Sequence, residues 1–437
     1  MNINYILYIM RNLIFSVLTL LYGTFLFAQN TSNVLQVGVA NNASVLQVGA
    51  NNSDVDQIGN NNDSTVDQLG INDSDIDQTG NNNSARVIQR GFFNRSVVIQ
   101  TCNFNIARVL QFGIFNFSSI IQNGNGNFAT ATQFGNFNIS AISQFGNGNF
   151  AGVWQFGTSN VAFVHQGING PKINDFNNAT IIQNGSSNFA HIDEFGDIGG
   201  SDFNRSRIDQ NGNNNFSYNA QVGDFNISAQ DQTGNLNYSY VYQFGDRNSS
   251  NEDQTGTSNN STTLQFGNLN NSRVEQIGEN NLSTVTQNGT NNNSTVLQGF
   301  FGAGGNDHVS DVDQTGINNN SFVGQHGTAN YSDVDQTGTA NSSWVAQIGV
   351  TNESYVEQIG LGNNSTVDQI GNNNVATVYQ NGIGNLSDID QNGNNHYSCV
   401  EQIGNNNISM TSQTGFNHSS IVTQLGNNNI SSVTQTN

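Results

Sequence analysis

From Asn30 to Gln435 the chain repeats one short pattern, and this repeat constrains the fold more than any other feature of the sequence. Each unit reads N-x-(S/A)-x-(V/I)-x-Q-x-G, and successive glutamines lie almost always 11 residues apart. Of the 36 units, 35 keep Gln, with Glu194 as the exception, and all 36 keep Ser or Ala at the third position. Such a repeat indicates a solenoid, in which each unit packs only against its neighbours.

Odd and even units differ, so the structural repeat is 22 residues rather than 11. The small residue alternates between Ser and Ala from Ser74 to Ala151. Acidic residues before Gln also skip alternate units, as at Asp209 and Asp231. We therefore expect about 18 rungs of 22 residues, with two strands in each rung.

The alternation within a unit shows which side chains face inward. Asn, Ser/Ala, Val/Ile and Gln are spaced by two, so they share one face of a strand. The positions between them accept Asp56, Arg86 and Trp154, which indicates a solvent-facing side. The predicted fold class is all-β: a two-sheet parallel β-solenoid with cross-β-like stacking, sheets about 10 Å apart and rungs about 4.8 Å apart. Val/Ile, Gln, Asn and Ser/Ala should be buried in every unit, and the Gly after Gln suits a tight turn.

Buried Asn and Gln require hydrogen-bond partners, and the repeat supplies them. Each amide has the same amide one rung above and below, so it can donate to one and accept from the other. A single gap leaves two groups unpaired, which accounts for the near-invariance of Gln. Asn is replaced only by His, at His308, His396 and His418, because His retains a donor and an acceptor.

This spacing resembles the curlin repeat of curli subunits, the extracellular amyloid fibres of bacterial biofilms. It reads here as Ser118-x3-Gln122-x-Gly124-x2-Asn127-x-Ala129-x3-Gln133, and the resemblance covers residues 30–435. The resemblance implies a secreted structural protein, a homopolymer forming a functional amyloid or fibre of the biofilm matrix. It also implies a nucleator subunit and an outer-membrane secretion channel as partners. Family members carry about five repeats and a non-repeat segment after the signal, whereas here the repeats begin at Asn30.

The terminal rungs are the expected assembly ends, since no capping segment is evident before or after the repeats. An uncovered strand offers unpaired N–H and C=O groups to another molecule, so the first rung can continue the ladders of the last. In curlins, the resemblance implies, the Asn, Ser and Gln of terminal repeats matter for nucleation. The ladder residues of the two ends are Asn30, Ser32, Gln36, Asn41, Ala43 and Gln47, and His418, Ser420, Gln424, Asn429, Ser431 and Gln435.

Residues 1–28 differ from the rest of the chain. Arg11 precedes a mostly apolar run from Leu13 to Phe27, which is typical of a secretory signal peptide and short for a spanning helix. Translation could begin at Met1 or at Met10. We expect residues 29–437 to form the secreted repeat domain, located outside the cell or on its surface.

Three insertions interrupt the repeat, near residues 167–177, 196–204 and 299–308. The first two follow odd units and should leave the same edge one rung apart. His165, His191 and Asp193 should point outward beside them, and Glu194 should enter the Gln ladder. These four residues are either a metal or ligand site or ordinary surface beside tolerated loops.

The composition of the chain excludes some classes of function. Ten Lys and Arg against 31 acids, a net charge of −21, exclude a nucleic-acid binder. No nucleophile motif, phosphate loop or metal spacing is present, so we expect no enzyme and no cofactor. Cys102 and Cys399 fall 13 rungs apart and should stay unbridged within one chain.

Outer-face rows leave an alternative open: a non-polymerising adhesin or binding rod that contacts matrix or host surface. Residues 109–170 contain no charged residue, and Phe112, Phe134 and Phe156 should stack there, as should Phe244 and Phe266. The acid rows Asp209-Asp231-Asp253-Glu275 and Asp313-Asp335-Glu357 indicate either a solvated face or Ca²⁺ bridging.

Overall fold

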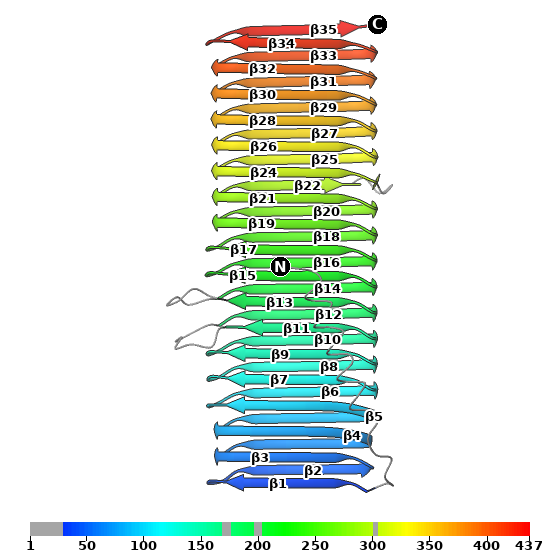
Figure 1. Ribbon diagram of the computed structural model, residues 1–437, viewed down its shortest axis with the longest axis vertical. Coiled ribbons are helices and arrows are strands. Elements are labelled where there is room, and N and C mark those ends of the chain that lie inside the picture. The colour runs from blue at the N-terminus through cyan, green and yellow to red at the C-terminus, as the bar shows by residue number, and fades with distance from the viewer. Residues whose placement is uncertain (1–28, 168–175, 196–202, 300–304) are drawn as a thin grey trace, which may run out of the picture.

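The computed structural model describes residues 29–167, 176–195, 203–299 and 305–437. The predicted signal peptide and most of the three insertions lie outside these described residues. Within them the chain forms 35 strands and no helix, so no helix there could span a membrane. Figure 1 shows the strands stacked in order from β1 at one end to β35 at the other.

The strands have the following bounds: β1 (Thr31–Val37), β2 (Asn42–Gly49), β3 (Asn52–Asn60), β4 (Asp63–Asn81), β5 (Ser84–Thr101), β6 (Ile106–Ile114), β7 (Phe117–Asn123), β8 (Phe128–Asn136), β9 (Ile139–Phe145), β10 (Phe150–Thr158), β11 (Val161–Gln166), β12 (Asn178–Ser186), β13 (Phe189–Phe195), β14 (Arg205–Asn213), β15 (Phe216–Val222), β16 (Ile227–Asn235), β17 (Tyr238–Phe244), β18 (Ser249–Thr257), β19 (Asn260–Asn268), β20 (Asn271–Glu279), β21 (Leu282–Thr290), β22 (Asn293–Gln298), β23 (Gly305–Asn306), β24 (Val309–Ile317), β25 (Asn320–Thr328), β26 (Tyr331–Thr339), β27 (Ser342–Val350), β28 (Glu353–Leu361), β29 (Asn364–Asn372), β30 (Val375–Ile383), β31 (Leu386–Asn394), β32 (Tyr397–Asn405), β33 (Ile408–Phe416), β34 (Ser419–Leu425) and β35 (Ile430–Thr436).

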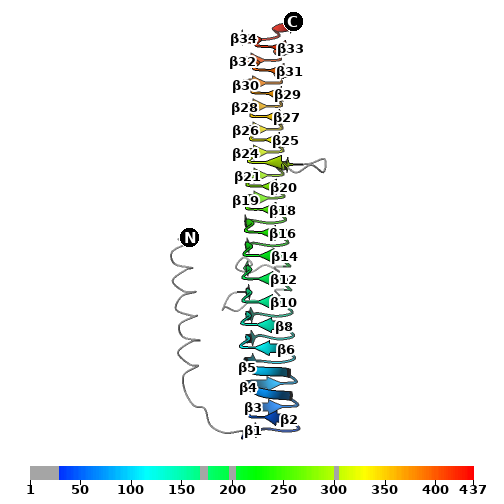
Figure 2. The same cartoon turned by 90° about the vertical axis from the view of Figure 1, so that its right-hand side faces the viewer.

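Each strand pairs in parallel with the strand two units away, so odd and even units build separate columns. Gln36 lies in register with Gln57, and Gln47 with Gln68. Viewed from the side, the two columns form a narrow rod (Figure 2). The prediction of a two-sheet parallel solenoid with about 18 rungs is therefore confirmed. The long strands β4 and β5 pass through a corner and contribute to both columns.

The interior is the predicted face of each strand. Away from the ends, every ladder Gln is buried, as are Glu194, which replaces one of them, and the Val or Ile residues two positions before this position. The apolar core nevertheless consists of two clusters, one ending at Ile208 and the other beginning at Val274. Between them the same interior position holds polar side chains, which are fully buried beside Val241: Asn219, Gln230, Glu252 and Thr263.

Two backbone positions shape each corner. The Gly after Gln has a positive φ, +126° at Gly135, and a Cβ there would lie 1.9 Å from the carbonyl oxygen of Gly157 in the next rung. The residue before the ladder Asn is also left-handed, at Asn214 (φ 56°) and even at Phe115 (φ 58°). The first position agrees with the predicted tight turn at Gly, because a Cβ at Gly135 would collide with the next rung, and Cys102 is the one described non-Gly residue there with a positive φ, at 77°. The second was not predicted, and Asn tolerates it better than most residues.

Candidate functional site

Two rows of glutamines run along the interior, one in each column. Gln111 Nε2 donates to Gln133 Oε1 at 2.8 Å, and Gln133 Nε2 donates to Gln155 Oε1 at 2.8 Å. The second hydrogen of Gln133 Nε2 goes to the backbone carbonyl of Phe117, in the facing column, at 2.9 Å. Each Gln therefore joins its rung to the next and also joins the two sheets. In every Gln–Gln bond among the described residues the donor belongs to the rung nearer the N-terminus, so both rows have the same polarity.

Glu194 enters the odd row in place of Gln and interrupts it. Gln166 Nε2 donates to Glu194 Oε2 at 2.7 Å, which continues the row from below. A carboxylate has no N–H to pass on, and the next amide, Gln221, instead accepts from the Ser206 hydroxyl at 2.9 Å. The row resumes when Gln221 Nε2 donates to Gln243 Oε1 at 2.8 Å.

The ladder asparagines hold the corners. Asn94 Oδ1 accepts from the backbone N–H of Asn116 at 3.1 Å, and Asn116 Nδ2 donates to the carbonyl of Gly135 at 2.7 Å. His308 takes over the acceptor role through Nδ1, which receives the backbone N–H of Asn330 at 3.3 Å. Histidine is therefore accepted at this position as a replacement hydrogen-bond acceptor, in agreement with the prediction.

The terminal rungs differ from all others in exposure. Asn30, Ser32 and Gln36 are exposed, and Val34 is 48% exposed, whereas Val55 one rung above is 0% exposed. The prediction that the interior set is buried in every unit is therefore wrong for these rungs. The physical reason is that β1 and β2 have a rung on one side only, as do β34 and β35.

The other end residues follow the same trend. Those that are only partly buried are Asn41, Ala43, Gln47, His418, Asn429, Ser431 and Gln435. Ser420 and Gln424 remain buried, at 5% and 6% exposure. Both ends thus present inward-type side chains to solvent.

The terminal strands are also uncharged, which the sequence analysis missed. No Asp, Glu, Lys or Arg lies between residues 29 and 53 or between residues 402 and 437, although the chain carries a net charge of −21. Exposed apolar side chains lie there instead, including Leu35 (51%), Leu425 (67%) and Ile430 (77%). Charges are a common means of protecting a sheet edge from association, and these ends lack them.

A compact polar cluster lies on the outer face of the odd column, built from β11, β13 and β15. His165 on β11 is in register with Asp193 on β13, and His191 is in register with Tyr218 on β15. Asp193 Oδ1 lies 3.0 Å from His165 Nδ1 and 2.9 Å from His191 Nε2. The two ring nitrogens are 3.4 Å apart, and the Tyr218 hydroxyl donates to Asp193 Oδ2 at 2.8 Å.

The environment of this cluster shifts the pKa values of Asp193 and Tyr218. Burial alone would raise the pKa of Asp193, but hydrogen bonds from His165, His191 and Tyr218 hold it well below its usual range. Burial and the adjacent Asp193 carboxylate raise the pKa of Tyr218. Phe163 and Phe189 pack edge-on against His191. The three predicted outer residues therefore meet in one site, while Glu194 points into the core.

The described ends of the insertions agree with the predicted shared edge. Gln166 at the end of β11 is in register with Glu194 near the end of β13, so the first two insertions leave the same edge on adjacent odd strands. After the third insertion the chain rejoins the even column at Gly305, which is in register with Gly278.

The acid rows are in register as predicted. Asp313, Asp335 and Glu357 are consecutive partners on β24, β26 and β28. Burial and these neighbouring carboxylates raise the pKa of Asp333, on the same face, to about 6. In the other row Arg207 pairs with both Asp209 and Asp231, at 2.7 and 2.8 Å.

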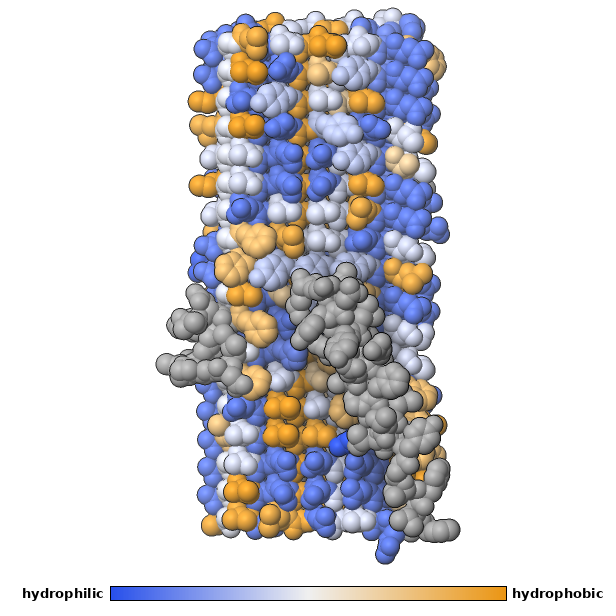
Figure 3. All heavy atoms as spheres, in the orientation of Figure 1, coloured by the Kyte–Doolittle hydropathy of each residue, from blue (hydrophilic) through white to orange (hydrophobic). Residues whose placement is uncertain are grey.

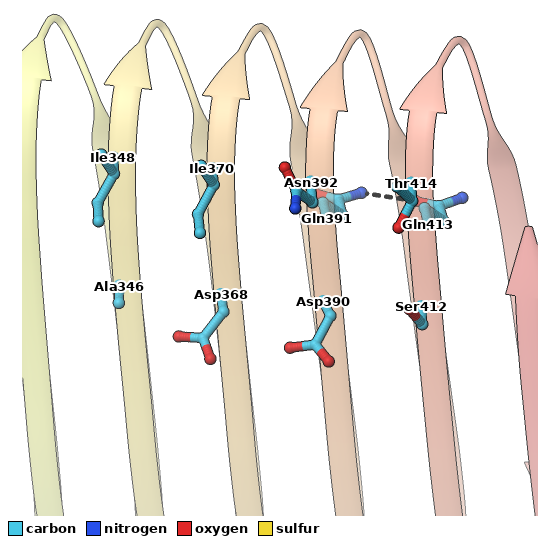
Figure 4. Close-up of a pocket in the computed structure, with 10 residues that line it drawn as sticks. All are labelled: Ala346, Ile348, Asp368, Ile370, Asp390, Gln391, Asn392, Ser412, Gln413 and Thr414. Atoms are coloured by element: carbon cyan, nitrogen blue, oxygen red, sulfur yellow. Dashed lines mark hydrogen bonds between the residues drawn. The ribbon is translucent and has the colours of Figure 1, made fainter. Parts of the chain in front are cut away.

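A shallow depression on the even column contains a smaller acid pair (Figure 4). Asp368 and Asp390 project from β29 and β31 there, near the buried bond in which Gln391 donates to Gln413 at 2.9 Å. Burial, and then Asp390, raise the pKa of Asp368. The rest of the lining consists of amide, hydroxyl and aliphatic side chains.

Aromatic rows stack along the outer corners. Phe112 and Phe134 have ring centroids 4.9 Å apart, and Phe134 and Phe156 are 5.7 Å apart. Phe244 and Phe266 are in register, and the ring of Phe266 contacts that of Tyr242 in a tilted arrangement, with centroids 5.8 Å apart. A second row, Phe93–Phe115–Phe137, was not predicted because it occupies the left-handed corner position. Figure 3 shows similar side chains stacked in columns along the rod.

Cys102 and Cys399 are both free, as the rung count predicted.

Comparison with known proteins gives one family. A family model described as the curlin associated repeat matches residues 80–113 and 371–404, while no curated protein matches the chain. The first match covers β5 and most of β6, and the second covers β30, β31 and most of β32. The repeat and the solenoid are features of curli-like fibre and surface proteins, a structural and extracellular family. Two matches in distant parts of one solenoid, whose rungs share the same Gln and Asn geometry, support membership of the curlin-repeat family.

Proposed function

We propose that the protein is a subunit of a curli-like extracellular fibre and that it assembles head to tail, with the first rung of one copy stacked on the last rung of another. The observation that carries the proposal is the pair of uncharged end rungs, each with a rung on one side only. In a protein of net charge −21, charge-free ends remove the repulsion that would otherwise oppose stacking.

The two ends are complementary in length and register. Strand β1 has seven residues with Gln36 sixth, and β34 has seven residues with Gln424 sixth. Strands β2 and β35 place Gln47 and Gln435 sixth as well. Stacking therefore brings Gln36 onto Gln424 and Gln47 onto Gln435 without any shift.

The polarity of the glutamine rows supports the same joint. Gln424 and Gln435 each donate one hydrogen to a backbone carbonyl, at 2.9 Å, which leaves the other hydrogen directed along the row. Gln36 and Gln47 donate upward, to Gln57 and Gln68, so their Oε1 atoms face the end of the rod. A donor end meets an acceptor end, and because this contact does not close it produces a filament.

The test uses two half-blocked chains. Gln36→Lys with Gln47→Lys blocks the N-terminal end, and Gln424→Lys with Gln435→Lys blocks the C-terminal end. Buried unpaired ammonium groups cost several kcal/mol, so each blocked joint should weaken at least about a hundredfold. Each variant alone should remain monomeric by light scattering and electron microscopy, while an equimolar mixture should give dimers and nothing longer.

The matched control places the same charge on the outward face of the same end strands. Asn33→Lys with Ser44→Lys should still form fibres, because neither side chain enters the joint. Far-UV circular dichroism would establish that all variants remain folded. If either half-blocked chain forms fibres at the wild-type rate, stacking of the ends is not the mode of assembly.

The stacked row of Phe112, Phe134 and Phe156 favours a second candidate function, that of a rod that binds surfaces through its outer face. Phe134 and Phe156 are 38% and 39% exposed within the charge-free stretch from residue 109 to residue 170. Phe134→Ser with Phe156→Ser should then reduce retention on a hydrophobic surface without changing fibre growth. Retention equal to wild type would count against this second function.

A further inference from the structure

We propose that His165, His191 and Asp193 form a binding site for a divalent first-row transition metal ion, Zn²⁺ in particular, on the outer face of the odd column. The site is independent of end-to-end assembly, since it lies in the middle of the rod.

The spacing of the three ligand atoms fits such an ion. In tetrahedral coordination at the usual Zn–N and Zn–O lengths, neighbouring ligand atoms lie about 3.3 Å apart. The three separations here are 2.9 Å, 3.0 Å and 3.4 Å, between Asp193 Oδ1 and the two histidine nitrogens and between the nitrogens themselves. The three separations therefore lie close to those between three ligand atoms of a tetrahedral ion. The donor set, two imidazoles and one carboxylate, is one that Zn²⁺ accepts readily.

The surroundings hold the ligands in place and leave a route for the ion. Asp193 is 8% exposed, and the hydroxyl of Tyr218 fixes its second oxygen, a support typical of carboxylate ligands. Aromatic rings of Phe163, Phe189 and Tyr218 flank His191. The His165 side chain is 45% exposed, so the fourth coordination position can be reached by water from that side.

The position of the site suggests its effect. It connects β11 to β13 at the rung where Glu194 interrupts the glutamine row and where two insertions leave the same edge. A bound ion would add a link between strands at the place where the interior has lost one. Zn²⁺ should therefore stabilise the fold as well as bind to it.

The experiment titrates Zn²⁺ alone into the mature chain at pH 7.5, with heat and thermal unfolding as readouts. One equivalent should bind and raise the unfolding temperature, and Co²⁺ should give the visible absorption of a four-coordinate site. His165→Ser and Asp193→Ala should abolish both effects. Each substitution introduces the residue that an adjacent rung carries in register, Ser143 and Ala220, so the strands should still form.

Two further variants separate a built site from general affinity for histidine. Tyr218→Phe retains all three ligands and should weaken binding about tenfold, the usual effect of removing a supporting hydrogen bond. His326→Asn removes an outward histidine from β25 and should change nothing. If the wild-type chain takes up no Zn²⁺, or if His165→Ser and Asp193→Ala bind it as the wild type does, the three residues are a hydrogen-bonded cluster only.

Discussion

Glu252 allows a sharp test of how this interior is stabilised. Its side chain is 0% exposed and lies in register between Gln230 and Val274 in the even column. The Ser239 hydroxyl donates to Glu252 Oε2 at 2.7 Å. Burial raises the pKa of Glu252, and hydrogen bonds from the hydroxyls of Thr263, Ser239 and Ser261 offset this only in part.

Glu252→Val places the consensus residue at this position and should stabilise the fold at neutral pH. Replacing a buried ionisable group by a packed apolar side chain is worth about 1–4 kcal/mol where the fit is good. The Ser239 hydroxyl loses its acceptor, which costs about 1 kcal/mol. We therefore expect a gain of about 2 kcal/mol at pH 7.5.

The stability gained from Glu252→Val should depend on pH, and the raised pKa determines the direction of that dependence. The folded protein holds the Glu252 proton more tightly than the unfolded chain does, so the wild type gains stability as pH falls through the folded pKa. That contribution is complete below the ordinary value of 4.5. The advantage of Glu252→Val should accordingly shrink between pH 7.5 and pH 4.

Guanidinium unfolding followed by circular dichroism, on the chain blocked at its N-terminal end, would measure the effect without interference from fibres. Asn219→Val is the matched control, because Asn219 is also buried at the same interior position but is neutral, and its amide atoms have no hydrogen-bond partner among the described residues. That variant should stabilise the fold equally at both pH values. A gain for Glu252→Val that does not change with pH, or a loss of stability, would refute the reasoning.

Three further outcomes follow from the rungs themselves. Gly135→Ala should lower the denaturant concentration at the unfolding midpoint more than Gly126→Ala does. A Cβ at Gly135 would lie 1.9 Å from the Gly157 carbonyl oxygen, whereas a Cβ at Gly126 would meet open space. Equal losses in a denaturant titration would contradict this. Burial and neighbouring acids raise the pKa of Asp333 to about 6, so Asp333→Asn should raise stability at pH 7.5. Near pH 3 the carboxyl is protonated in the folded and the unfolded protein, and the substitution should have no effect. The same effect at both pH values would argue against this cause. Burial lowers the pKa of His308 to about 4, so the wild type should lose stability as pH falls from 6.5 toward 4, and His308→Asn should abolish that part of the pH dependence in the same titration.

The fold could be predicted because a repeat tests each inference many times. Alternation at spacing two identified the inward face, and Gln at 35 of 36 positions identified a ladder that tolerates few gaps. The cluster around Asp193 could also be anticipated, since outward residues on neighbouring rungs of a solenoid lie close together. What the spacing could not provide was the ligand geometry, which depends on the orientation of each ring and on support from Tyr218, one rung further along.

Other features were outside the reach of the repeat pattern. The left-handed residue before the ladder Asn accepts Asn, Phe, Ser and Ala, so its conformation leaves no single-residue signature. The polar gap in the core was visible as departures at Asn219, Gln230, Glu252 and Thr263, but only the register shows that these residues lie together and divide the apolar core. Burial at the end rungs was mispredicted because a periodic pattern treats every unit as an interior one.

The common direction of the glutamine rows would favour the proposed head-to-tail growth. Amide dipoles that point the same way along a row strengthen one another, so each added rung is held by a row already polarised toward it. Reversing one molecule in a filament would place donor against donor at one joint and acceptor against acceptor at the other, leaving buried amides unpaired at a cost of about 1–3 kcal/mol each. With two rows in each rung, a reversed joint would lose both Gln–Gln bonds as well as the parallel strand register. A filament assembled as proposed would therefore be polar, because the end that presents Gln36 and Gln47 differs chemically from the end that presents Gln424 and Gln435.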